Sequence, residues 1–131
     1  MGWGKDFYRQ QLGYLGSGDI DGLLQNHYHE DAVMVTFDGI RRGHAELKDY
    51  FVDRLQSIGQ ITYMATEYFA ETEDVIIFKA TLRGENEGEL HADNALVVED
   101  GKITRHIALT ILPKYLEENM YEEWGTTWTE D

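Results

Sequence analysis

The sequence predicts an α+β domain in which three helices pack on one face of a curved sheet. Apolar residues recur mainly at helical spacing up to Gly59 and at a period of two after it. The second part also carries a strong hairpin signal, because Asp100-Gly101 lies between two alternating runs rich in branched residues. Helices followed by a run of antiparallel strands are typical of this fold class.

Each element has its own local signal. The first helix has an apolar stripe and ends at Gly16-Ser17-Gly18, and Asp19 is a candidate N-cap for the second. The third is the longest clean helical pattern, and the strands show alternation between turn residues. The expected elements are helices over residues 3–16, 19–30 and 43–59, a strand over 32–37, strands over 61–71 and 75–83, and two strands on either side of the turn at 99–102.

Length and composition limit the class of protein. The chain has 131 residues, 42% of them hydrophobic, which suits one globular domain over residues 1–113 followed by an acidic, aromatic extension over 114–131. Without cysteine it has no disulfide and no thiol nucleophile. The net charge of −14 argues against binding to nucleic acid and against anionic partners. No apolar run approaches the ~20 residues of a membrane helix, and the start lacks a signal-peptide pattern, so we expect a soluble, cytoplasmic protein without membrane partners.

Four ionisable side chains lie in the hairpin strands, which ought to be at least half buried. They are His91 and Asp93 on the first strand and Arg105 and His106 on the second. Charge in a buried segment needs a reason, since desolvation is costly. Either these faces meet water, or they line a pocket in which an acid and an imidazole take part in chemistry.

Three phrases of the sequence, in this order, resemble the nuclear transport factor 2-like superfamily, most closely its SnoaL-like and ketosteroid-isomerase-like branches. They are GDIDGLLQNHYHEDAV, RRGHAELKDYF and VVEDGKITRH, and the resemblance covers Phe7 to Leu112. It implies a cone-shaped, curved antiparallel or mixed sheet with three helices on its concave side around one cavity. It also implies a homodimer formed through the outer face of the sheet.

The same resemblance implies site residues. Asp93 falls where ketosteroid isomerases have an acid that donates to a developing oxyanion, whereas the position of their helix-one tyrosine falls on Gln11 and that of their base on Thr36. His106 and Thr110 fall on the cavity side of the last strand. Steroid isomerisation is therefore not the expected reaction.

From these residues we predict that Asp93 and His106 form an acid–base pair, since strands joined by a tight turn bring cross-strand neighbours together. Desolvation would raise the pKa of the acid, and imidazole titrates near neutral pH. Tyr14 and Thr110 would position the ligand. Tyr28 would form part of the cavity wall and His91 would widen the polar patch.

The alternatives are structural. Asp93 would then be a solvated residue of an open face, and His106 a hydrogen-bonded core or interface histidine. Simple alternation favours this interpretation, because the odd positions of the last strand are the more apolar and would turn His106 outward. A dimer that buries the outer face would also account for these apolar odd positions, and His106 could then face the cavity. The odd positions are Ile103, Ile107, Leu109 and Ile111.

The functional hypothesis is a small cavity enzyme of the isomerase, lyase or cyclase type, acting by proton transfer on an apolar or aromatic, oxygen-bearing molecule. The alternative is a module without catalysis that binds a hydrophobic ligand or, through an acidic tail with Trp124 and Trp128, another protein. No cofactor is expected, because no phosphate-binding glycine loop occurs. No metal is expected either, since His27 and His29 lack a fixed third ligand.

Overall fold

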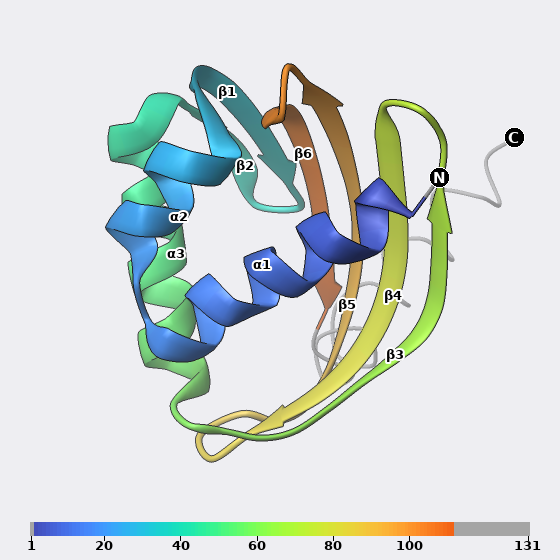
Figure 1. Ribbon diagram of the computed structural model, residues 1–131. Helices are drawn as coiled ribbons and strands as arrows, with labels where there is room; N and C mark the ends of the chain where they lie inside the picture. Colours follow the sequence, from blue (N-terminus) through green and yellow to red (C-terminus); the bar gives the residue numbers. More distant parts are fainter. Residues whose placement is uncertain (1, 112–131) are drawn as a thin grey trace, which may run out of the picture.

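The computed structural model describes residues 2–111, which form three helices and one six-stranded sheet (Figure 1). The predicted extension over 114–131 lies outside the described residues. In chain order the elements are α1 (Trp3–Ser17), α2 (Ile20–His27), β1 (Tyr28–Thr36), β2 (Gly39–Arg42), α3 (Gly43–Ile58), β3 (Ile61–Glu71), β4 (Val75–Gly84), β5 (Gly88–Glu99) and β6 (Lys102–Ile111).

The predicted fold class is confirmed, with two differences in the segment between the second and third helices. That helix ends at His27, because Tyr28 already has extended dihedrals and starts β1, earlier than the predicted strand. The turn after β1 leads into a short strand, β2, which pairs antiparallel with β1 and which the sequence pattern did not reveal. Four residues are too few to show a period.

The strand order of the sheet is β2-β1-β6-β5-β4-β3. All neighbouring pairs are antiparallel except β1 and β6, which run parallel. The sheet is strongly curved and does not close, and the three helices lie in its hollow (Figure 1). The hairpin prediction is confirmed: Asp100 and Gly101 both have positive φ angles, 52° and 78°, as a two-residue type I′ turn requires.

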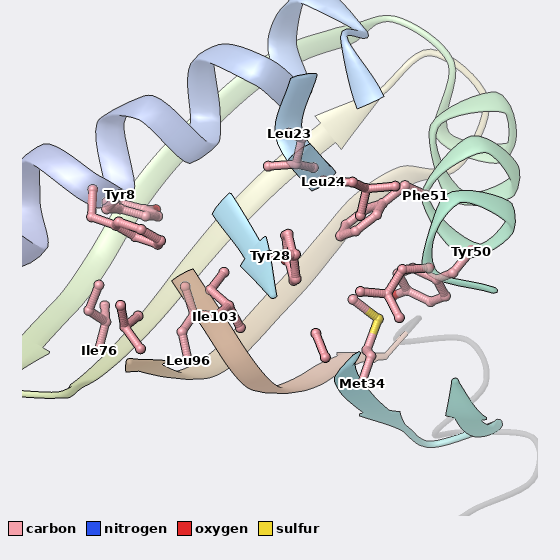
Figure 2. Packing of buried hydrophobic residues seen from close by; sticks show 14 of the residues in the cluster. Tyr8, Leu23, Leu24, Tyr28, Met34, Tyr50, Phe51, Ile76, Leu96 and Ile103 are labelled. Atoms are coloured by element: carbon pink, nitrogen blue, oxygen red, sulfur yellow. The ribbon is translucent and has the colours of Figure 1, made fainter. Parts of the chain in front are cut away.

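A close-packed core fills one end of the hollow. Tyr8 of α1 packs on Phe78 of β4 with ring centres 4.4 Å apart, and Tyr28 is completely enclosed beside Phe51. Figure 2 shows Tyr28 among buried side chains of both the helices and the sheet. The largest side chains without exposure are Leu23, Tyr28, Met34, Leu47, Ile76, Leu90, Leu96 and Ile103.

The outer face of the sheet is also apolar along one line. A single row of residues in register crosses all six strands, and its four large members are 38–58% exposed. Apolar side chains therefore lie on both faces of the sheet, in the core and in this row. The row consists of Ile40, Val35, Ile107, Ala95, Ile77 and Ala70, in the order β2 to β3.

A close approach at the end of β4 fixes the C-terminal end of α3. A Cβ atom on Gly84 would lie 2.5 Å from the carbonyl oxygen of Ile58. We therefore expect Gly84→Ala to lower the free energy of unfolding by about 1–3 kcal/mol, since the backbones must separate. Urea denaturation followed by circular dichroism measures the change.

The matched control is Gly13→Ala in the exposed middle of α1, where a Cβ meets no atom within 4 Å. This change should raise the free energy of unfolding by about 0.5–1 kcal/mol, because alanine is the better helix former. Equal stability of the Gly84→Ala variant and the parent protein would refute the close approach.

Candidate functional site

A cavity of about 670 Å³ lies at the open end of the hollow. Its walls come from the second half of α1, the second half of α3, the start of β3 and the concave face of β4, β5 and β6. The lining is mainly apolar, with Leu12, Leu55, Ile58, Phe78, Leu82 and Leu90 among its members. A volume and lining of this kind suit a small apolar molecule.

Polar groups interrupt this lining at defined places. The sheet contributes Asn94, His106 and Thr110. The helices contribute Gln11, Ser17, Tyr50 and Arg54, and Gln60 follows the third helix. Among residues 2–111, no aspartate or glutamate lines the cavity. The polar chemistry that these residues offer is therefore mainly that of uncharged donors and one guanidinium.

His106 belongs to a chain of buried hydrogen bonds. Its Nδ1 lies 2.8 Å from the hydroxyl of Tyr28, and its Nε2 lies 2.7 Å from Oδ1 of Asn94. The Tyr28 hydroxyl accepts a hydrogen bond from Nε2 of Gln11 at 2.9 Å, and Oε1 of Gln11 lies 2.9 Å from Nδ1 of His27. Side chains from α1, α2, β1, β5 and β6 thus meet in one network.

The orientation of the Gln11 amide gives this chain a direction. Its oxygen only accepts, so Nδ1 of His27 donates to it, and its NH₂ group donates to Tyr28. The Tyr28 hydroxyl is then free to donate to Nδ1 of His106, whose proton is on Nε2 and is donated to Asn94.

The assignment of donors and acceptors extends to the end of the hydrogen-bond chain at His27. Nε2 of His27 has to accept, so the exposed amide of Gln10, whose oxygen is placed 3.0 Å away, has to present its NH₂ group to the ring. With this one rotation, each ring nitrogen of His27 and His106 that carries a proton meets an acceptor, and each that does not meets a donor.

Burial keeps the side chains of this hydrogen-bond network uncharged. Desolvation lowers the pKa of His106 to about 3 and that of His27 to about 4. The same cause raises the pKa of Tyr28 well above its usual range, which keeps the phenol protonated. At neutral pH, His106 is therefore a neutral hydrogen-bond donor and not an acid–base group with a pKa near 7.

The structure does not form the predicted Asp93–His106 pair. Asp93 lies opposite Leu109, and His106 lies opposite Leu96. Strand alternation places Asp93 on the outer face, since its neighbour Asn94 lines the cavity. The residue of β5 that bonds to His106 is therefore Asn94, one position after Asp93, and its side chain is an amide and not a carboxylate.

The remaining predicted residues divide between the two faces. Thr110, like His106, lines the cavity, whereas Tyr28 lies behind His106 and bonds to its ring. His91 is exposed on the outer face, 3.3 Å from the hydroxyl of Thr81. Tyr14 is bonded to Asn26 on the helical surface and does not line the cavity.

Sequence reasoning did not assign Gln11, Arg54 and Asn94 to the cavity, although signals for them existed. Gln11 occupies the position of the helix-one tyrosine in the family pattern, and Arg54 lies on the apolar face of the third predicted helix. Asn94 is in the predicted strand, next to Asp93. A polar residue on an apolar helix face is the signal that most directly indicates a cavity.

A second, more open hollow of about 700 Å³ lies between α2, α3 and the start of β1. Its acids and bases are partly paired with one another, as Lys48 and Asp21 are at 2.9 Å, and His44 bonds to the Tyr28 carbonyl. Among residues 2–111, no cluster of three or more His, Asp or Glu side chains is arranged to hold a metal ion. This hollow therefore offers less specific chemistry than the cavity.

A curved sheet that encloses a cavity together with three helices defines the nuclear transport factor 2-like superfamily. Residues 8–106 match the family model of the SnoaL-like domain, and the chain belongs to this family. No curated protein matches it in sequence. None of the helices within residues 2–111 is long and apolar enough to cross a membrane.

Solved structures share the fold at low sequence identity. A protein from Kribbella flavida has a TM-score of 0.74 at 14% identity, with 100% of both chains covered. AclR from Streptomyces galilaeus, assigned as a hydroxylase, has a TM-score of 0.71 at 16% identity over 89% of this chain and 84% of its own. A protein from Shewanella putrefaciens, assigned as a SnoaL-like polyketide cyclase, has a TM-score of 0.71 at 12% identity over 93% and 88%.

The direction of the hydrogen-bond chain is testable. Nitrogen-15 NMR of the imidazole rings should show the proton of His106 on Nε2 and no titration between pH 5 and 8, because the ring is buried. In Tyr28→Phe, Nδ1 loses its donor, so both tautomers should appear. The unfolding free energy should fall by about 1–3 kcal/mol, the cost of the unpaired groups.

Tyr14→Phe is the matched control, since it removes a hydroxyl bonded only to Asn26 among the described residues. The tautomer of His106 should not change in this variant. A parent protein with the proton on Nδ1 of His106, or with a pKa near 6.5 for this ring, would contradict the assigned direction.

Proposed function

We propose that this protein is an enzyme of the isomerase, lyase or cyclase type, whose cavity binds an apolar molecule and polarises its carbonyl group. The observation that carries the proposal is the chain of neutral donors that ends at Asn94, on the wall of an otherwise apolar cavity. Among residues 2–111 the NH₂ group of Asn94 has no hydrogen-bond partner. A ligand oxygen is the natural acceptor for it.

The chain also explains why the donor is effective. Gln11, Tyr28 and His106 are each held by hydrogen bonds on both sides, so they orient Asn94 before the ligand arrives. Fixed donors in a site with little water stabilise negative charge that develops on an oxygen. Hydrogen bonds to a carbonyl oxygen therefore favour formation of the enolate next to it.

The substrate class follows from the lining. Because no carboxylate of the described residues lines the cavity, a substrate with an acidic C–H group next to its carbonyl suits the site best. A base from the solvent, hydroxide or buffer, takes the proton, and Asn94 holds the enolate. The carbon is then reprotonated by water, or it attacks a second carbonyl of the same molecule, whose oxygen takes a proton from water. Two similar structures assigned as a polyketide cyclase and a hydroxylase support an oxygen-rich, apolar substrate.

A second candidate is a carrier that binds such a molecule without converting it. Both ring nitrogens of His106 are engaged, and its lowered pKa makes it a poor base, which favours this candidate. The two candidates bind similar ligands and differ only in whether a C–H bond is broken.

The test is deuterium uptake by 2-tetralone, a bicyclic ketone, in D₂O. The protein should accelerate exchange at the carbon next to the carbonyl, and Asn94→Ala should slow the catalysed exchange by about tenfold or more, the effect of losing one oxyanion donor. Proton NMR measures the rate. Asp93→Ala, one residue along the strand but on the outer face, should leave it unchanged.

Binding of 2-tetralone without exchange would favour the carrier. Equal rates in the Asn94→Ala variant and the parent protein would contradict the role of the amide. Equal losses in the two variants would contradict the assignment of faces.

We also propose that a second copy of the chain covers the outer face of the sheet. The apolar row from Ile40 to Ala70 crosses every strand. Beside it, Lys79 and Asp93 form a pair of neighbours of opposite charge on adjacent strands. A two-fold axis that passes close to this pair would bring the lysine of one copy next to the aspartate of the other.

Ile107→Lys should therefore convert a dimer into a monomer, because Ile107 lies within the row and a buried lysine would have no partner there. Sedimentation equilibrium measures the mass. Gln56→Lys adds the same charge on the exposed side of α3 and should leave the dimer intact. A monomeric parent protein at high concentration would refute the proposal.

A further inference from the structure

Arg54 is the cavity residue that the proposed function does not use. It lies on α3, lines the cavity, and its Nε atom is buried. Among residues 2–111 its guanidinium makes no hydrogen bond and no ion pair. The guanidinium carbon lies over the ring of Tyr50, 5.6 Å from the ring centre.

Arg41 contacts the same Tyr50 ring but, unlike Arg54, its guanidinium has hydrogen-bond partners within residues 2–111. Its guanidinium carbon lies 4.8 Å from the centre of the same Tyr50 ring, but it also donates to Thr36 at 2.8 Å and contacts Asp38 at 3.3 Å. The ring alone therefore does not account for the hydrogen-bonding capacity of Arg54, which has five donors.

No carboxylate among residues 2–111 forms an ion pair with Arg54. The side chains three and four residues away on the helix are aromatic, apolar or a serine. That serine, Ser57, donates to Glu87, whose second oxygen is buried without a hydrogen-bond partner in residues 2–111. Glu87 nevertheless does not come within the 4.0 Å of an ion pair with Arg54.

A cation without a counter-charge on the wall of an apolar cavity is costly, unless the ligand supplies the charge. We propose that Arg54 binds a carboxylate of the ligand, which makes the ligand an apolar, ring-bearing carboxylic acid. The inference rests on the proposed function in using the same cavity. It adds a second attachment point on α3, separate from the carbonyl site at Asn94 on β5.

The net charge of −14 does not oppose this binding inside the cavity. Repulsion from exposed carboxylates is screened beyond about 10 Å at an ionic strength of 0.1 M. The guanidinium acts at contact distance, where a charge-assisted hydrogen bond to a carboxylate is strongest. The overall acidity should therefore slow the approach of an anionic ligand at low salt without preventing its binding.

The test compares anthraquinone-2-carboxylate with its methyl ester by isothermal titration calorimetry. The two have the same rings and carbonyls and differ in charge. The parent protein should bind the acid at least about tenfold more tightly, the factor expected for one charge-assisted pair in a partly desolvated site. Arg54→Gln should abolish this preference, and Arg54→Lys should retain part of it.

Glu87→Gln is the matched control. If Arg54 serves the ligand, this variant should keep the preference for the acid. If Arg54 pairs with Glu87 instead, then Glu87→Gln and Arg54→Gln should destabilise the protein alike and the acid should have no advantage. That result would overturn the proposal, as would equal binding of acid and ester or no binding of either.

The same titrations separate this inference from the proposed function. Anthracene-2-carboxylate has the carboxylate but no carbonyl oxygen. Asn94→Ala should weaken binding of the anthraquinone acid and not that of the anthracene acid. A loss of acid preference in Arg54→Gln together with no effect of Asn94→Ala would support the carboxylate site while refuting the carbonyl site. The converse result would refute the carboxylate site alone.

Discussion

The parallel pairing of β1 with β6 is the constraint on which the site depends. It joins the N-terminal half of the chain to the C-terminal hairpin and brings Tyr28 into contact with His106, 78 residues away. Between Tyr28 and Val33 the register shifts, so that the pairing is irregular where β1 leaves α2. Once the two strands pair, their buried polar groups require partners, and Gln11 and Asn94 supply them.

The electrostatics of the cavity follow from that enclosure. His27 and His106 are neutral because protonation would place a buried charge without a counter-charge. Their pKa values are lower in the folded than in the unfolded state, so folding is favoured least in acid and gains stability as the pH rises toward 6.5. Arg54 also lines the cavity, but its side chain is a guanidinium, whose charge a ligand in the cavity can reach. The sheet wall therefore stays neutral, and the helix wall carries the positive charge.

The sequence predicted those parts of the structure that local patterns determine. The three helices and the hairpin at Asp100-Gly101 were of this kind, since capping, helical spacing and turn chemistry act over a few residues. The inner face of β6 was harder to predict, because Ile107 and Leu109 on its outer face are more apolar than His106 and Thr110 on its inner one. Alternation identifies residues that share a face. It does not identify the face that encloses a cavity, where small and polar residues replace the usual core.

The asparagine at position 94 links the neutral hydrogen-bond network to the kind of ligand that the cavity can bind. An aspartate there would accept the hydrogen bond of His106 equally well, but its charge would raise the pKa of the ring and leave only acceptors facing the ligand. Asparagine keeps the pair neutral and turns a donor toward the cavity. Arg54 also offers only donors. Two opposed donors, one neutral and one charged, favour a ligand with acceptor oxygens at both ends and apolar rings between them. The cavity thus selects its ligand by the direction of hydrogen bonding as much as by shape.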